Sequence, residues 1–154
     1  RFIGVNFLLS ILVLVWVADI FAYFAGRAFG GRFSRGKLAP SISPGKSWEG
    51  VWGGMAGVVV LAFAWVWADR WLGAGVASFY TRLSSHGIVV LLIAVLFMAA
   101  MSVVGDLVES LIKRSAGVKD SSGLLPGHGG VLDRVDALLP TLPLAMMLAT
   151  LGRP

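Results

Sequence analysis

The chain has 154 residues, of which 57% are hydrophobic and only 14% are charged. A soluble domain carries about 25% charged residues, so this composition excludes an ordinary soluble protein and indicates a membrane protein. The net charge of +5 does not indicate a nucleic-acid partner, because the Lys and Arg residues lie in short connections between apolar segments, as membrane topology requires. The sequence has no cysteine, which excludes disulfides and cysteine-ligated metal sites.

Four apolar segments are predicted to form a bundle of transmembrane helices, so the expected fold class is all-α. A spanning helix needs about 20 mostly apolar residues. The predicted helices cover residues 2–24, 48–71, 87–113 and 136–151. The last is short and carries Pro140 and Pro143, so we expect it to be kinked or tilted. Because the chain begins at Arg1 with no Met or leader segment, we expect residues 1–154 to be a single membrane domain of a longer protein.

Two polar connections, residues 26–47 and 113–135, hold nine of the 13 Lys and Arg residues. The positive-inside rule therefore places both connections in the cytoplasm. In this topology Asp69 is the one acidic residue that falls on the opposite side. All other acidic residues fall on the cytoplasmic side, which would not be expected if acids were scattered along the chain. The sequence therefore predicts one polar site near the cytoplasmic face.

Polar side chains gather on one face near the end of the third predicted helix. Asp106, Glu109, Ser110 and Lys113 stand at positions i, i+3, i+4 and i+7. In the simplest interpretation these are end-of-helix charges that pair with one another and reach water. Carboxylates are unnecessary for that purpose and costly at that depth, so we predict that this face is functional.

A second acidic pair, Asp133 and Asp136, begins the fourth predicted helix. Acids favour helix N-termini, so Asp133 could be a cap with no other role. Mg²⁺ prefers oxygen ligands and binds proteins through one or two carboxylates together with substrate phosphates. Combined with Asp106, the pair therefore predicts a divalent-metal site.

The connection between these acids, SAGVKDSSGLLPGHGG, is rich in Gly and Ser and holds Lys119 and His128. Backbone N–H groups before a helix start are able to bind phosphate. With Lys113 and Arg114 nearby, the connection is predicted to bind a nucleoside triphosphate or pyrophosphate, although it lacks the Walker A pattern. His128 either contacts the phosphate or base, or only supports the loop.

The first polar connection is also basic, and topology and attraction to anionic lipids explain part of its charge. Its segment SPGKS, at residues 43–47, directly precedes the second predicted helix. A lysine at a helix N-terminus suits a phosphate, so Lys46 is a candidate ligand. The glycines that follow predict close packing of helices and not a binding site.

Together these motifs resemble the signature of the phosphatidate cytidylyltransferases, also called CDP-diacylglycerol synthases. The signature run extends over 27 consecutive positions and includes SLIKR at 110–114, KD at 119–120, PGHGG at 126–130 and DRVD at 133–136. Upstream, DIFAYFAGR at 19–27 and SPGKSWEG at 43–50 are similar to further motifs of that family. The resemblance covers the whole chain and corresponds to the C-terminal, catalytic part of a family member.

The resemblance implies transfer of the cytidylyl group from CTP to phosphatidate, giving CDP-diacylglycerol and pyrophosphate. It implies Mg²⁺ with a second, monovalent cation such as K⁺, a homodimer, and an active site facing the cytoplasm in a bacterial inner membrane or its equivalent. Asp19 and Glu49 are candidates of second rank. The implied site residues are catalytic Asp106, Ser110, Lys113, Asp133 and Asp136, metal-binding Asp106, Asp133 and Asp136, and substrate-binding Arg114, Lys119, His128 and Lys46.

Two other functions fit part of the pattern. A CTP-dependent polyprenol or dolichol kinase would also need acidic residues and a basic loop. A small ion transporter would use intramembrane acids as an ion path, but it predicts acids spread through the depth of the membrane. The complete motif run favours the cytidylyltransferase over both.

Overall fold

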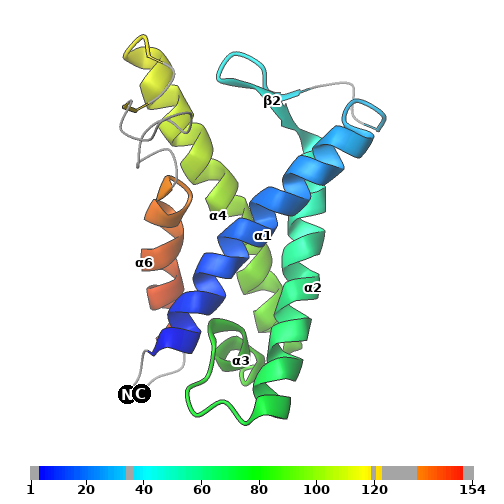
Figure 1. The fold of residues 1–154 in the computed structure, drawn as a ribbon, viewed down its shortest axis with the longest axis vertical. Helices are drawn as coiled ribbons and strands as arrows, with labels where there is room; N and C mark the ends of the chain where they lie inside the picture. The colour runs from blue at the N-terminus through cyan, green and yellow to red at the C-terminus, as the bar shows by residue number, and fades with distance from the viewer. Residues whose placement is uncertain (1–3, 34–36, 119–120, 123–134, 151–154) are drawn as a thin grey trace.

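The computed structural model describes residues 4–33, 37–118, 121–122 and 135–150. Within this part of the chain the fold is a helical bundle with one small hairpin (Figure 1). The elements in chain order are α1 (Val5–Phe29), β1 (Lys37–Ala39), β2 (Ser43–Ser47), α2 (Trp48–Leu72), α3 (Phe79–Ser84), α4 (Ile88–Ser115) and α6 (Leu138–Ala149). The all-α membrane fold predicted from the sequence is confirmed.

Three helices, α1, α2 and α4, are long and apolar enough to cross a membrane. They contain 25, 25 and 28 residues, so each exceeds the length of about 20 residues that a crossing requires. The apolar helix α6 has only 12 residues and contains Pro143. At about 1.5 Å per residue it extends about 18 Å, which is less than the hydrocarbon core of about 30 Å. Within the described residues the bundle therefore has three long helices, α1, α2 and α4, and the shorter helices α3 and α6, and the chain is an integral membrane protein.

The long helices alternate in direction, and α1 lies antiparallel along α2 (Figure 1). The hairpin of β1 and β2 stands at one end of the bundle, and α3 stands at the other (Figure 1). We refer to these as the hairpin end and the α3 end. The helix α4 packs against α2 and α3, and α6 packs against α4.

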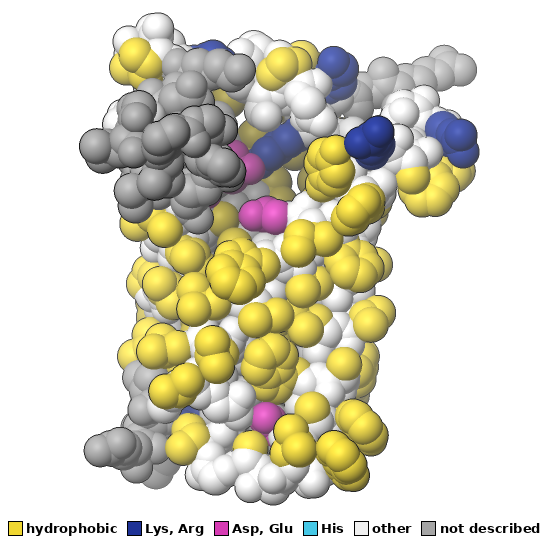
Figure 2. Space-filling model, viewed as in Figure 1, with side chains coloured by type: hydrophobic (Ala, Val, Ile, Leu, Met, Phe, Trp, Pro, Cys, Tyr) yellow, Lys and Arg dark blue, Asp and Glu magenta, His cyan; other side chains and the backbone are white. Residues whose placement is uncertain are grey.

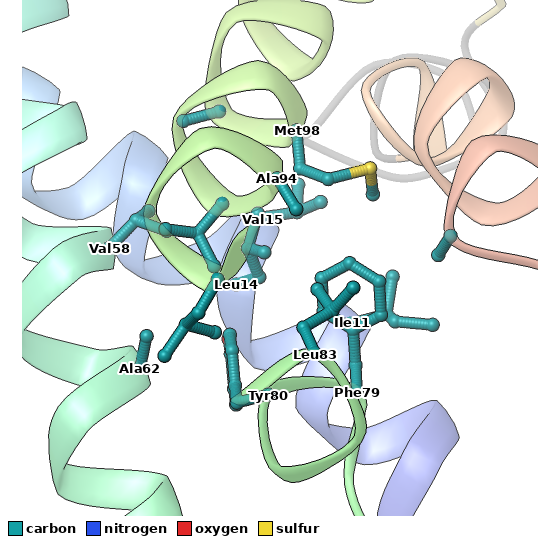
Figure 3. Packing of buried hydrophobic residues seen from close by; sticks show 14 of the residues in the cluster. Ile11, Leu14, Val15, Val58, Ala62, Phe79, Tyr80, Leu83, Ala94 and Met98 are labelled. Atoms are coloured by element: carbon teal, nitrogen blue, oxygen red, sulfur yellow. The ribbon is translucent and has the colours of Figure 1, made fainter. Parts of the chain in front are cut away.

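The hydrophobic core lies mainly in the half of the bundle near α3 (Figure 3). Ile11 and Leu14 of α1 meet Val58 of α2, Tyr80 of α3 and Met98 of α4 there, and all five side chains are buried. Burial of such side chains removes apolar surface from the solvent and fixes the positions of the helices. The half near the hairpin holds fewer of the large buried apolar side chains, and the polar side chains of interest lie there.

The helices α1 and α2 approach each other through glycines, as the sequence predicted. A Cβ atom built on Gly53 would lie 2.1 Å from the Cβ atom of Ala25, and one built on Gly54 would lie 2.8 Å from the carbonyl oxygen of Ala18. No larger side chain fits at either position without a shift of α1. Small residues at such contacts are a common means of packing helices in membranes.

Hydrogen bonds tie the α3 end together around Asp69. Its carboxylate accepts from the Asn6 amide at 3.0 Å, the Thr81 hydroxyl at 2.6 Å and the Ser78 backbone N–H at 3.2 Å. The Trp65 indole N–H donates to the Asn6 side-chain oxygen at 3.1 Å. We call these residues the Asp69 cluster. They join α1, α2 and the segment leading into α3, which gives this isolated acid a structural role.

The hairpin was not predicted, because the sequence indicated only a loop before the second helix. Strand β1 pairs antiparallel with β2, with Lys37 opposite Ser47 and Ala39 opposite Ser43. The Ser47 hydroxyl then caps α2 by accepting from the backbone N–H of Gly50 at 3.2 Å. The predicted helix start at Trp48 is confirmed, and the strand before it fixes the position of Lys46.

Candidate active site

A cavity of about 550 Å³ lies beneath the hairpin, between α1, α2 and α4. We call it the main cavity. Small residues form much of its wall, including glycines of α1 and α2. Figure 2 shows acidic and basic side chains around a hollow near the hairpin end, whereas the face below is mostly hydrophobic. The charged or phenolic side chains that line the main cavity are Asp19, Tyr23, Arg27, Lys46 and Asp106.

Lys46 of β2 and Asp106 of α4 form an ion pair across this cavity. The exposed fractions of the two side chains are 24% and 32%, so solvent screens the pair and its contribution to stability is about 0–1 kcal/mol. The Ser110 hydroxyl donates to the other oxygen of Asp106 at 3.3 Å. Three residues predicted as site residues are therefore linked, since both Lys46 of β2 and Ser110 of α4 contact Asp106.

Asp19 of α1 lies on the facing wall of the main cavity. Its carboxylate interacts electrostatically with Asp106 and with Lys46. From the sequence, Asp19 was a candidate of second rank. The structure brings it to the same cavity as Asp106.

A second cavity of about 350 Å³ lies between α4 and α6 and is mainly apolar. Its polar lining consists of Glu109, Lys113 and Asp136. Glu109 and Lys113 form an ion pair at 2.7 Å, one helical turn apart. The predicted polar face of α4 is thus divided, since Asp106 lines the main cavity while Glu109 and Lys113 line the smaller one.

Asp136 lies just before α6 and outside the three long spans. The pKa of its carboxyl is raised above the ordinary value. Burial is the main cause and the negative charge of Asp106 adds to it, whereas a hydrogen bond from the Ala137 N–H at 2.6 Å opposes both. Gly105 permits α6 to approach α4, because a Cβ atom there would lie 2.7 Å from Pro140 Cγ and 3.0 Å from the Asp136 carbonyl oxygen. The two predicted acids on α4 and before α6 therefore influence each other.

These carboxylates suit a hard cation. Mg²⁺ takes oxygen ligands and needs only one or two carboxylates when substrate phosphates and water complete its coordination. A cation shared by Asp106 and Asp136 would also reduce their mutual repulsion. Within the described residues no group of three acidic or histidine side chains could hold a metal ion. The third predicted ligand, Asp133, lies outside those residues.

Of the remaining predicted residues, the structure describes Arg114 and Glu49, and neither lines a cavity. Arg114 is exposed at the end of α4 and lines neither cavity. Glu49 is buried and accepts a hydrogen bond from the Phe33 backbone N–H at 3.2 Å, which ties the chain after α1 to the start of α2. Lys119 and His128 lie outside the described residues, so their predicted contacts with phosphate stay predictions.

Two residues of the main cavity, Tyr23 and Arg27, were not among the predicted site residues. They follow Asp19 at intervals of four, so the three stand on one face of α1. This spacing was the signal available in the sequence. Arg27 was instead counted with the topological charge and included in the family-like segment at 19–27, without a role in the site.

Comparison with known proteins gives a consistent result. A model of the cytidylyltransferase family matches residues 1–151. The chain is 49% identical over 140 residues to a phosphatidate cytidylyltransferase of Haemophilus influenzae, covering 91% of this chain and 44% of that protein. The Pseudomonas aeruginosa phosphatidate cytidylyltransferase is 46% identical over 136 residues, covering 88% and 44%, and that of Bacillus subtilis is 38% identical over 148 residues, covering 96% and 49%.

The chain spans less than half the length of each of these relatives. The family model nevertheless covers almost the whole chain, and it includes both the upstream segment around Asp19 and the motif run that ends at Asp136. The family resemblance seen in the motifs is confirmed: the chain belongs to the cytidylyltransferase family.

Proposed function

We propose that the complete protein containing this chain transfers the cytidylyl group from CTP to phosphatidate, with CDP-diacylglycerol and pyrophosphate as products. The observation that carries the proposal is the main cavity, where Lys46 and Asp106 pair across from Asp19 and near Asp136. The names of the relatives support CTP and phosphatidate as the substrates.

In the proposed reaction a phosphate oxygen of the lipid attacks the α-phosphorus of CTP, and pyrophosphate leaves. Such a transfer needs little covalent chemistry from the protein, because positioning and charge neutralisation account for most of the rate. Asp106 and Asp136, together with Asp133, would hold Mg²⁺, which supplies charge neutralisation at the phosphate oxygens when bound. A second, monovalent cation such as K⁺ belongs to the same proposal.

Other residues would orient these groups. Ser110 fixes one oxygen of Asp106 through its hydrogen bond, and Glu109 holds the ammonium group of Lys113 at the smaller cavity. Lys46 stands in the main cavity, where a phosphate could exchange for Asp106 as the partner of its ammonium group. We assign Arg114, Lys119 and His128 to the triphosphate, as the motif resemblance implies.

We further propose that the hairpin end faces the cytoplasm and that the protein is a homodimer, as family resemblance suggests. The positive-inside rule supports the orientation. Because CTP is soluble and phosphatidate lies in the bilayer, their phosphates would meet near the headgroup level, where the long helices end. The described basic residues at or near the hairpin end are Arg27, Arg32, Lys37, Lys46, Lys113 and Arg114.

The proposal is tested with the complete protein in phosphatidate-containing vesicles and CTP labelled at either the α- or the γ-phosphate. We expect the α-label in the lipid, release of pyrophosphate, and loss of both on chelation of divalent metal, with recovery when Mg²⁺ is added. The γ-label in the lipid would instead identify a kinase. Metal-dependent ion flux with neither label in lipid would identify a transporter.

A further inference from the structure

We propose that Arg27 of α1 binds the phosphate chain of the nucleotide and that Tyr23 positions the Arg27 guanidinium. This inference rests on the proposed function and names two further residues of the same site. Both side chains line the main cavity.

Asp19, Tyr23 and Arg27 form a continuous polar strip along the cavity wall. They lie at positions i, i+4 and i+8 of one helix, so successive residues are about 6 Å apart along the axis and the strip is about 12 Å long. Asp19 marks the end that interacts with Asp106. Arg27 marks the opposite end, in the last turn of α1 beside the hairpin.

The Arg27 guanidinium donates to the Tyr23 hydroxyl at 3.0 Å. Lys46 and Lys113 each pair with a carboxylate, whereas the structure shows no ion pair for Arg27 among the residues it describes. A guanidinium carries five N–H donors in a planar fork that matches the oxygens of a phosphate. Arg27 therefore presents an oriented positive charge, with donors available, to the main cavity.

The length of the strip favours a chain of phosphates over a single one. The backbone positions of Asp19 and Arg27 lie about 12 Å apart along the axis, and a phosphate group close to Asp106 lies at the Asp19 end of the strip. The consecutive phosphates of a nucleoside triphosphate extend further along such a wall than the single phosphate of a lipid headgroup. In this arrangement Arg27 contacts the phosphates that leave as pyrophosphate.

The simplest alternative gives Arg27 only a topological role. A basic residue at a helix C-terminus stabilises the helix dipole and favours the cytoplasmic side. Lysine would serve both purposes equally well. It would not reproduce the bidentate contact of arginine with a phosphate.

The test uses the complete protein with Arg27→Lys, Arg27→Gln and Tyr23→Phe, and with Arg32→Gln as the matched control, since Arg32 is exposed just after α1 and does not line the cavity. Loss of a hydrogen-bonded charge contact corresponds to about a 10- to 100-fold loss of affinity. We expect Arg27→Gln to raise the KM for CTP and the inhibition constant for pyrophosphate by this factor, while the KM for phosphatidate stays unchanged. Arg27→Lys and Tyr23→Phe should show the same change to a smaller extent.

Direct binding of pyrophosphate with Mg²⁺, measured by calorimetry without turnover, separates this inference from the proposed reaction. A protein that binds pyrophosphate through Arg27 but forms no CDP-lipid would refute the reaction and keep the binding site. Full pyrophosphate affinity in Arg27→Lys and Arg27→Gln, or a rise in the KM for phosphatidate alone, would overturn the assignment of Arg27. An equal loss in Arg32→Gln would show that only general basic charge matters, and it would overturn the assignment as well.

Discussion

Replacement of Gly53 by alanine would place a methyl group where α1 already lies. The added Cβ atom would lie 2.1 Å from the Cβ atom of Ala25, whereas ordinary van der Waals contact begins at 3.4 Å. The helices must therefore separate locally by 3.4 minus 2.1 Å, or about 1.3 Å. Overpacking of this kind costs about 1–3 kcal/mol, and the better helix propensity of alanine returns about 1 kcal/mol. We expect the free energy of unfolding to fall by about 0–2 kcal/mol.

The double variant Gly53→Ala/Ala25→Gly moves one methyl group from α1 to α2 and provides the decisive comparison. Ala25→Gly alone should cost about 1 kcal/mol through helix propensity. The double variant should be about as stable as the wild type, because the clash is gone and the two changes in helix propensity cancel, so the two substitutions are strongly non-additive. Gly75→Ala is the control, since a Cβ atom there would have no neighbour within 4 Å. It should change stability by less than about 0.5 kcal/mol.

Stability is measured by unfolding of the complete protein in detergent, followed by tryptophan fluorescence. A Gly53→Ala variant that is more stable than the wild type would contradict this packing. Effects of the two single variants that simply add in the double variant would contradict it as well. Either result would mean that α1 and α2 are not in the close contact described.

The remaining predictions concern the polar residues. Asp106→Asn and Asp136→Asn should each reduce CDP-lipid formation at least about 100-fold. Each should also abolish any stabilisation by Mg²⁺ in thermal unfolding, while the metal-free variant unfolds as the wild type does. Near-normal turnover in both would contradict the metal assignment. Lys46→Met should raise the KM for CTP about 10-fold. It should change the free energy of unfolding by less than about 1 kcal/mol, because its ion pair with Asp106 is partly exposed. A large loss of stability would show that the pair is structural. Asp69→Ala should lower that free energy by about 1–3 kcal/mol, because partly buried donors lose their acceptor. It should leave both KM values unchanged; an altered KM would place the Asp69 cluster in substrate binding.

The helices were predictable because a bilayer demands long apolar segments, and the sequence supplies them with clear polar interruptions. The end of α1 was predicted poorly. The helix extends through Gly26 and Arg27 to Phe29, because neither residue prevents the backbone hydrogen bonds of the last turns. The hairpin could not be foreseen, since Lys37–Ser47 contains two prolines and no alternation of apolar and polar residues.

The site was predictable where its residues lie close in sequence. The spacing of Asp106 and Ser110 placed both on one face of α4, and their hydrogen bond agrees with it. The ion pair of Asp106 with Lys46 depends instead on the packing of β2 over α4, which no local pattern encodes. Likewise, helical spacing could not show that α6 covers Glu109 while Asp106 faces α1 and α2.

The contacts of α1 have a mechanical consequence. The helix is held at Asn6 by the Asp69 cluster, touches α2 at Ala18 through Gly54, and ends at the hairpin with Arg27 lining the cavity. Asn6 lies about 18 Å below Ala18 along the axis and Arg27 about 14 Å above it. If α1 pivots as a stiff rod within its close contact with α2, which extends from Ala18 to Ala25, a sideways movement of about 1 Å at Asn6 moves Arg27 in the opposite direction by at most about 0.75 Å. Substitutions at the far membrane surface would then alter the width of a substrate cavity that they never touch.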